Sequence, residues 1–168
     1  MLYNYTMNYL DKITELSNVG LLRQKLLDTK IVLVGGCFDI LHYGHLFFLT
    51  KAKQHGDHLM VLLETNAFIQ RVKKKKPVHT QMQRAEILAS LIPVDSVILL
   101  PELQKPNEEY RAIVHSIRPA TIAVTQGDRQ LTHKQQMAQE VGATIVEIEH
   151  LTSFSSSQLI TYAPILRD

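Results

Sequence analysis

The chain has 168 residues, of which 45% are hydrophobic and 20% charged, and its 18 Lys and Arg against 16 Asp and Glu give a formal net charge of +2. This length and composition suit one globular domain with its own hydrophobic core. A charge so close to zero does not by itself indicate nucleic-acid binding or a membrane surface. The sequence has neither a run of 18 apolar residues nor a basic-then-apolar leader, so we expect no membrane span and a cytoplasmic location.

Residues 8–28 carry leucines and isoleucines at helical spacing, interrupted near residues 18–20, which predicts two short helices. We assign them to a helical N-terminal extension, residues 1–29, ahead of a domain that covers residues 30–168. Its apolar faces are expected to pack on that domain or on a second copy, so a homodimer is plausible.

Strands and helices alternate through the rest of the chain. Strands are predicted over 31–34, 59–63, 97–100, 121–124 and 144–148, and helices over 43–55, 80–91, 107–116, 131–141 and from 155 onward, with a helical turn at 65–71. Gly56 is expected to stop the first of these helices, Thr80 and Gln83 form a capping-box pattern, and Gly142 ends a later helix. The pattern predicts a single doubly wound, Rossmann-like α/β domain with a five-stranded parallel sheet and a crevice at the carboxyl ends of the strands.

The first predicted strand runs directly into Gly35 and Gly36, which let the backbone turn sharply and approach a ligand closely. His42 and His45 follow, three residues apart, so the first turn of the next helix places both on one side. At that helix N-terminus they add side-chain donors to free N–H groups that already favour anions. This stretch therefore predicts a phosphate-binding site.

Other interpretations of this stretch are weaker. A metal site at His42 and His45 lacks a third ligand at useful spacing. Cys37 has no assigned base that would make it a nucleophile, and as the only cysteine it cannot form an internal disulfide, which fits a reducing compartment. Asp39 is expected to cap the helix while also orienting the loop.

The basic residues between positions 73 and 84 are expected at the same edge of the sheet as the glycines and histidines, at the carboxyl ends of the strands. The lysine run at 73–76 is either a solvated charged segment or a flexible loop that neutralises a triphosphate. Arg84, on the next predicted helix, is balanced between a salt bridge and a phosphate clamp.

Two polar clusters follow later strands. Gly127 and Asp128 form either an ordinary turn or part of a nucleotide site. In the second case Gly127 is a small residue that lies against the nucleotide, and the Asp128 carboxylate binds a hydroxyl group or a metal-bound water. Ser155, Ser156 and Ser157 precede the last predicted helix and form either a cap or a phosphate cradle, and we favour the cradle.

Taken together, these residues resemble the nucleotidyltransferase superfamily, specifically its cytidylyltransferase-like members. The carrying motif is Gly36-Cys37-Phe38-Asp39-Ile40-Leu41-His42-Tyr43-Gly44-His45, which matches the family's His-x-Gly-His signature and the preceding G-x-F-D. The similarity covers roughly residues 30–162. Within the family the chain resembles heptose 1-phosphate adenylyltransferases and glycerol-3-phosphate cytidylyltransferases, and more weakly archaeal-type FAD synthases.

The resemblance implies transfer of AMP or CMP from ATP or CTP to a small phosphorylated sugar or polyol, with release of magnesium pyrophosphate and no covalent enzyme intermediate. Mg²⁺ is expected to arrive with the nucleotide rather than on dedicated protein ligands. The catalytic residues it implies are His42, His45, Arg84 and lysines of the run, Lys73 and Lys74 foremost. The nucleotide-binding residues it implies are Gly35, Gly36, Cys37, Phe38, Asp39, Gly44, Gly127, Asp128, Ser155, Ser156 and Ser157.

Departures from the family pattern affect the base and the acceptor. His150 and Ser153 stand where the cytidylyltransferases place an arginine and a glycine, which favours ATP over CTP. Arg129 stands where an aromatic is frequent. An FAD synthase-like enzyme and a catalytically silent nucleotide-binding regulator are the alternatives, while the lysine run lacks the interleaved aromatics that nucleic-acid binding requires.

Overall fold

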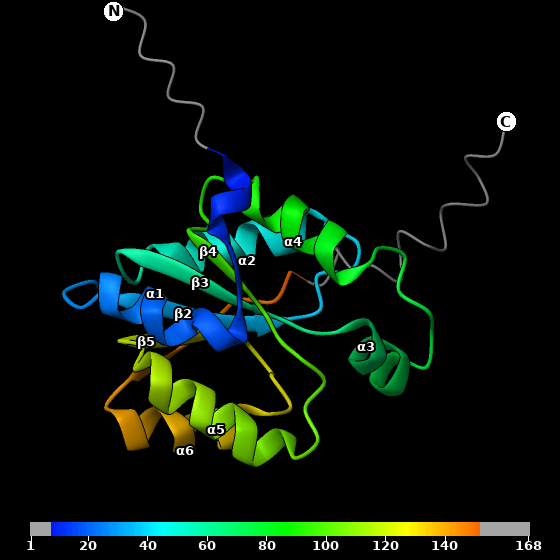
Figure 1. Ribbon diagram of the computed structural model, residues 1–168. Coiled ribbons are helices and arrows are strands. Elements are labelled where there is room, and N and C mark those ends of the chain that lie inside the picture. The colour runs from blue at the N-terminus through cyan, green and yellow to red at the C-terminus, as the bar shows by residue number, and fades with distance from the viewer. Residues whose placement is uncertain (1–7, 152–168) are drawn as a thin grey trace, which may run out of the picture.

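A computed structural model describes residues 8–151 as a parallel β-sheet covered by helices on both faces (Figure 1). The strands are β1 (Ile13–Glu15), β2 (Ile31–Gly36), β3 (His58–Leu63), β4 (Ser96–Leu99), β5 (Thr121–Thr125) and β6 (Thr144–Ile148). The α-helices are α1 (Val19–Lys25), α2 (Tyr43–Lys53), α3 (Asn66–Lys73), α4 (Gln81–Ala89), α5 (Pro106–Ile117) and α6 (Leu131–Val141). The doubly wound α/β prediction is confirmed. The predicted helix from Ser155 lies outside the described residues.

The sheet has six strands rather than the predicted five, in the order β1-β4-β3-β2-β5-β6. The additional strand, β1, comes from the N-terminal segment for which we predicted two helices, and it pairs in parallel with β4. Lys12 supports this placement because its Nζ donates to the carbonyl of Val94 at 2.8 Å. Short 3₁₀ turns at Tyr9–Lys12 and Leu16–Asn18 flank the strand. A strand of three residues is too short to show a period of its own in the sequence.

The second of the two predicted helices is present, and the predicted interruption falls where the 3₁₀ turn ends at Asn18 and α1 begins. Helix α1 begins at Val19, runs through Gly20, and buries Val19 beside α5. The N-terminal segment therefore completes one edge and one face of the sheet.

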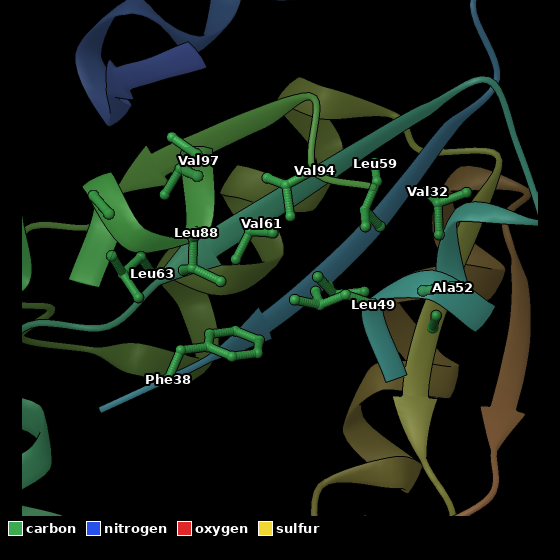
Figure 2. Packing of buried hydrophobic residues seen from close by; sticks show 14 of the residues in the cluster. Val32, Phe38, Leu49, Ala52, Leu59, Val61, Leu63, Leu88, Val94 and Val97 are labelled. Atoms are coloured by element: carbon green, nitrogen blue, oxygen red, sulfur yellow. The ribbon is translucent and has the colours of Figure 1, made fainter. Parts of the chain in front are cut away.

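Alternating side chains of the central strands build two separate apolar layers. One layer combines residues such as Val32, Val61 and Val97 with α2 and α4, and Figure 2 shows Leu49 and Leu88 packed into it. The other layer receives the intervening strand residues and packs them against α1, α5 and α6. Figure 1 shows α2 and α4 on one side of the sheet and α5 and α6 on the other.

The strand order reverses between β2 and β5, and these two strands separate toward their carboxyl ends. They pair only at Val32 with Thr121 and Leu33 with Ile122, although β2 continues to Gly36 and β5 to Thr125. The last residues of both strands therefore border an opening at the switch point, which is where open α/β sheets bind their ligands.

The predicted helix boundaries are largely correct, but Gly56 does not stop a helix as predicted. The Thr80–Gln83 capping box is present, and Gly142 ends α6 at a φ of 72°. Helix α2 ends before Gly56, at which a Cβ would lie 2.5 Å from the carbonyl oxygen of Lys30. Gly56 is thus required by close packing rather than by a left-handed turn. Among residues 8–151, no helix is long and apolar enough to cross a membrane.

Candidate functional site

A cavity of about 650 Å³ opens where β2 and β5 separate. It is formed by the loop after β2, the first turn of α2, the end of α3, and the carboxyl ends of β5 and β6. Of the residues predicted from the sequence, it brings together Gly35, Gly36, Cys37, Phe38, His42, Gly44, His45, Lys73 and Asp128. A cavity of this size accommodates a nucleotide.

The two histidines of the motif lie face to face in this cavity. Their ring centroids are 3.8 Å apart with an interplanar angle of 24°, and the Phe38 ring lies 5.2 Å from that of His45. His42 is the N-cap residue of α2 and makes no side-chain capping bond, so the expectation that Asp39 caps this helix is wrong. The Nδ1 of His42 is buried without a hydrogen-bonding partner among residues 8–151. That nitrogen is therefore an unsatisfied buried polar group in this arrangement.

Both imidazoles are neutral at physiological pH. The pKa of His45 is lowered to about 4, chiefly by burial and also by the charges of His42 and Lys73, with a partial offset from a backbone hydrogen bond to Ile40. Burial also lowers the pKa of His42, and His150 and Lys73 act in the same direction. A bound anion would raise the pKa of both imidazoles again, because a negative charge nearby favours the protonated ring and its N–H donors.

The glycines at the end of β2 serve different purposes. A Cβ on Gly36 would lie 2.9 Å from the Phe38 ring, so this glycine is needed to seat the aromatic side chain. A Cβ on Gly35 would make only ordinary contacts, 3.9 Å from Leu62. Gly35 borders the cavity, so the space that its missing side chain leaves is space for a ligand.

Asp39 is buried beside the cavity and connects two of the segments that surround it. The Asp39 carboxylate is 4% exposed and accepts hydrogen bonds from the backbone N–H groups of Val78, at 2.9 Å, and His79, at 3.2 Å. It joins the loop after β2 to the segment before α4. Asp39 is not among the residues that line the cavity, so direct nucleotide binding by this carboxylate stays a prediction.

The Arg84 guanidinium is fully buried and binds carbonyl oxygens rather than facing the cavity. Its Nη1 donates to Cys37 at 2.6 Å, and its Nη2 donates to the carbonyl of Glu64 at 2.9 Å and to Asn66 Oδ1 at 2.8 Å. Burial lowers its pKa, and the neighbouring acidic groups oppose that shift. In this arrangement Arg84 connects the loops after β2 and β3, and its role as a phosphate clamp stays a prediction.

The lysine run alternates between the cavity and the outside. Lys73 and Lys75 line the cavity, whereas Lys74 and Lys76 do not. Lys74 ends α3 in a left-handed conformation with a φ of 55°, which turns the chain and separates its neighbours. Lys75 was within the predicted run but was not singled out by the sequence.

Asp128 borders the cavity, and its carboxylate is paired. It accepts hydrogen bonds from Lys134 Nζ and from the backbone N–H of Gln130, each at 2.7 Å. Burial raises the pKa of Asp128, but these bonds and the lysine charge outweigh it and leave the pKa lowered. Gly127 adopts a φ of 79° in the turn after β5 and does not line the cavity.

Several cavity residues were not predicted. Lys134, Glu149, Phe48 and Thr125 also border it, together with His150, which the sequence flagged only as a departure from the family pattern. Lys134 lies one turn into the helix that follows Gly127-Asp128, and that position was the available signal. Ser155, Ser156 and Ser157 lie outside the described residues.

These observations define a doubly wound α/β protein with a crevice at its topological switch point that is lined by histidines and lysines. The family model described as cytidylyltransferase-like matches residues 33–161. The chain therefore belongs to the cytidylyltransferase-like family of nucleotidyltransferases, as the motif at residues 36–45 predicted.

Relatives and solved structures agree with this membership. The chain is 38% identical over 145 residues to the bifunctional protein HldE of Campylobacter jejuni subsp. doylei, covering 83% of this chain and 28% of that protein. It is 35% identical over 150 residues to HldE of Helicobacter hepaticus, covering 89% and 30%. The chain thus spans less than a third of the length of these relatives.

Among solved structures, the lipopolysaccharide core biosynthesis protein from Thermoplasma volcanium is similar with a TM-score of 0.58 at 25% identity, over 73% of this chain and 96% of that one. Pantoate-beta-alanine ligase from Francisella tularensis shares the fold with a TM-score of 0.62 at 18% identity, over 91% and 77%.

Proposed function

We propose that the chain transfers AMP from ATP to a small phosphorylated sugar, releasing pyrophosphate. The observation that carries this proposal is the stacked His42–His45 pair at the N-terminus of α2, facing a cavity that Lys73 and Lys75 also line. Imidazole donors, lysine cations and backbone N–H groups from separate elements converge on one space. That arrangement suits a polyphosphate, whose charge is distributed over many oxygens.

The reaction is a displacement at phosphorus. An oxygen of the acceptor's phosphate attacks the α-phosphorus of the nucleotide, a new P–O bond forms, and the bond to the bridging oxygen of pyrophosphate breaks. The acceptor phosphate is already an anion, so no side chain needs to remove a proton. The protein's contribution is to align two anionic reactants and to stabilise the charge that moves to the leaving group.

Each group in the crevice has a part in this scheme. His45 and His42 donate N–H hydrogen bonds to phosphate oxygens, and His45 contacts the α-phosphate in the transition state. Lys73 and Lys75 follow the departing pyrophosphate, and Arg84 holds the surrounding loops in position. Ser155, Ser156 and Ser157 are proposed to bind further phosphate oxygens.

Magnesium enters as part of the nucleotide complex, with the triphosphate oxygens as its principal ligands. The carboxylates that border the crevice are Asp128 and Glu149, and Asp128 is already paired with Lys134. The preference for ATP rests on the resemblance to heptose 1-phosphate adenylyltransferases and on His150, which stands where cytidylyltransferases place an arginine.

Pyrophosphate release by the purified chain with Mg²⁺ tests this proposal. ATP and CTP are each combined with sugar 1-phosphates, glycerol 3-phosphate and FMN, and the nucleotidyl product is identified by mass spectrometry. We expect release with ATP and a sugar phosphate. Release with FMN instead indicates an FAD synthase, and saturable ATP binding without release from any acceptor indicates a regulatory binding protein.

A further inference from the structure

A second cavity, of about 320 Å³, lies on the other side of the loop after β2. It is enclosed by the carboxyl end of β3 and the first turns of α3, α5 and α6. Three consecutive residues, Gly35, Gly36 and Cys37, border both cavities, and so does Lys134. A ligand in each cavity would therefore meet its neighbour at this shared wall.

The second cavity differs in chemistry from the first. Its apolar surface comes from Phe68, Pro106 and Met137, and its polar groups include Glu64 and Tyr110. Glu64 is 8% exposed, and the Tyr110 hydroxyl donates a hydrogen bond to its carboxylate. No described residue pairs with Glu64 in a salt bridge.

The Glu64–Tyr110 pair can accept hydrogen bonds but has none left to donate once the phenol is committed to the carboxylate. The carboxylate keeps free lone pairs, and the phenol oxygen can also accept. An anionic ligand group is repelled at this place, whereas a neutral hydroxyl group finds an acceptor. Aromatic and apolar walls beside hydrogen-bond acceptors form a surface on which a sugar ring packs by its C–H face while its hydroxyls reach the acceptors.

The rim toward the first cavity carries the opposite charge. Lys134 stands at the junction, 2.7 Å from Asp128 on the nucleotide side. Arg111 and His133 border the outer part of the second cavity. A ligand with a phosphate at one end and hydroxyls at the other would place the phosphate near Lys134 and the hydroxyls near Glu64.

We propose that the second cavity binds the body of a polyhydroxylated acceptor, with Glu64 and Tyr110 as the residues that select its hydroxyl groups and Lys134 as the residue that positions its phosphate. This inference rests on the proposed function and specifies its substrate class. A flat heteroaromatic acceptor without hydroxyls there leaves Glu64 desolvated with only the hydrogen bond from Tyr110, so it is discriminated against.

The test compares Glu64→Gln and Tyr110→Phe with the wild type and with Glu102→Gln, a control that removes an exposed carboxylate bound to Arg71. Two quantities are measured for each protein: the Kd of MgATP by calorimetry and the binding of glucose 1-phosphate and its deoxy analogues by saturation-transfer NMR. With the best acceptor of the panel, kcat and KM for both substrates are added. Circular dichroism and melting temperatures check that each variant is folded.

We expect Glu64→Gln and Tyr110→Phe to raise the acceptor's KM or Kd by about tenfold or more, to reduce the discrimination against deoxy analogues, and to leave the Kd of MgATP within about twofold. Glu102→Gln should match the wild type. An unchanged acceptor KM in both folded variants overturns the inference while leaving the transferase proposal intact. Failure of the wild type to bind any sugar phosphate also overturns it. If MgATP is not bound either, the proposed function fails with it.

Discussion

Replacing His45 with glutamine should change how the stability of the protein depends on pH. The pKa of this imidazole is about 4 in the folded protein, against 6.5 when it is unperturbed. Between these values the folded state binds fewer protons than the unfolded state, so stability falls as pH decreases through 6.5 toward 4. Above pH 6.5 the group is neutral in both states and contributes nothing. Between about pH 7.5 and about pH 4.5 the loss from His45 amounts to about 2.5 kcal/mol.

Urea denaturation at these two pH values measures the effect as a difference in the free energy of unfolding. The wild type should lose about 2.5 kcal/mol more than His45→Gln on acidification, because glutamine has no proton to gain. His55→Gln, at an exposed histidine, serves as the control and should follow the wild type. Equal acid destabilisation of His45→Gln and the wild type would refute the assignment of a buried, neutral His45.

Two further substitutions separate packing from ligand binding. Gly56→Ala should destabilise the fold by about 2 kcal/mol or more, since the new Cβ would lie 2.5 Å from a backbone carbonyl. Gly20→Ala in α1 should stabilise the fold by about 0.5 kcal/mol or more, because a Cβ there has no atom within 4 Å. Chemical denaturation measures both free energies of unfolding, and equal effects would contradict the prediction. The double variant Lys73→Ala/Lys75→Ala should lower kcat/KM for ATP by about tenfold or more, while Lys74→Ala/Lys76→Ala, which removes the same charge outside the cavity, should not. Equal losses would show that the run acts only through its total charge.

The sequence predicted the fold and the motif because both depend on strong local patterns. Continuous apolar runs such as residues 59–63 form buried strands whatever their partners, and Gly36 through His45 carries a specific spacing. Strand β1 was not predicted because it is defined by its pairing with β4, more than 80 residues away in the chain. A strand of three residues is also too short to show the two-residue alternation of a β-strand. Gly56 was predicted as the residue that stops α2, but the helix ends earlier and the carbonyl of Lys30 is what requires a glycine there.

The sequence does not show which polar side chains face the cavity and which bind backbone groups. Arg84 looks the same whether it faces phosphate or backbone carbonyls, and only the fold shows that its guanidinium is buried among carbonyl oxygens. The alternation of Lys73 and Lys75 with their exposed neighbours depends on the left-handed residue Lys74. The Glu64–Tyr110 pair joins residues 46 positions apart, which no local pattern signals.

We propose that the histidine pair at the N-terminus of α2 serves phosphate transfer rather than folding. Its most direct test is the rate of pyrophosphate release by His45→Ala with saturating MgATP and the preferred acceptor, alongside the free energy of unfolding at neutral pH. We predict that kcat falls by about a hundredfold or more while the variant remains folded and cooperative in denaturation. A folded variant with the turnover of the wild type would show that His45 has no part in the transfer.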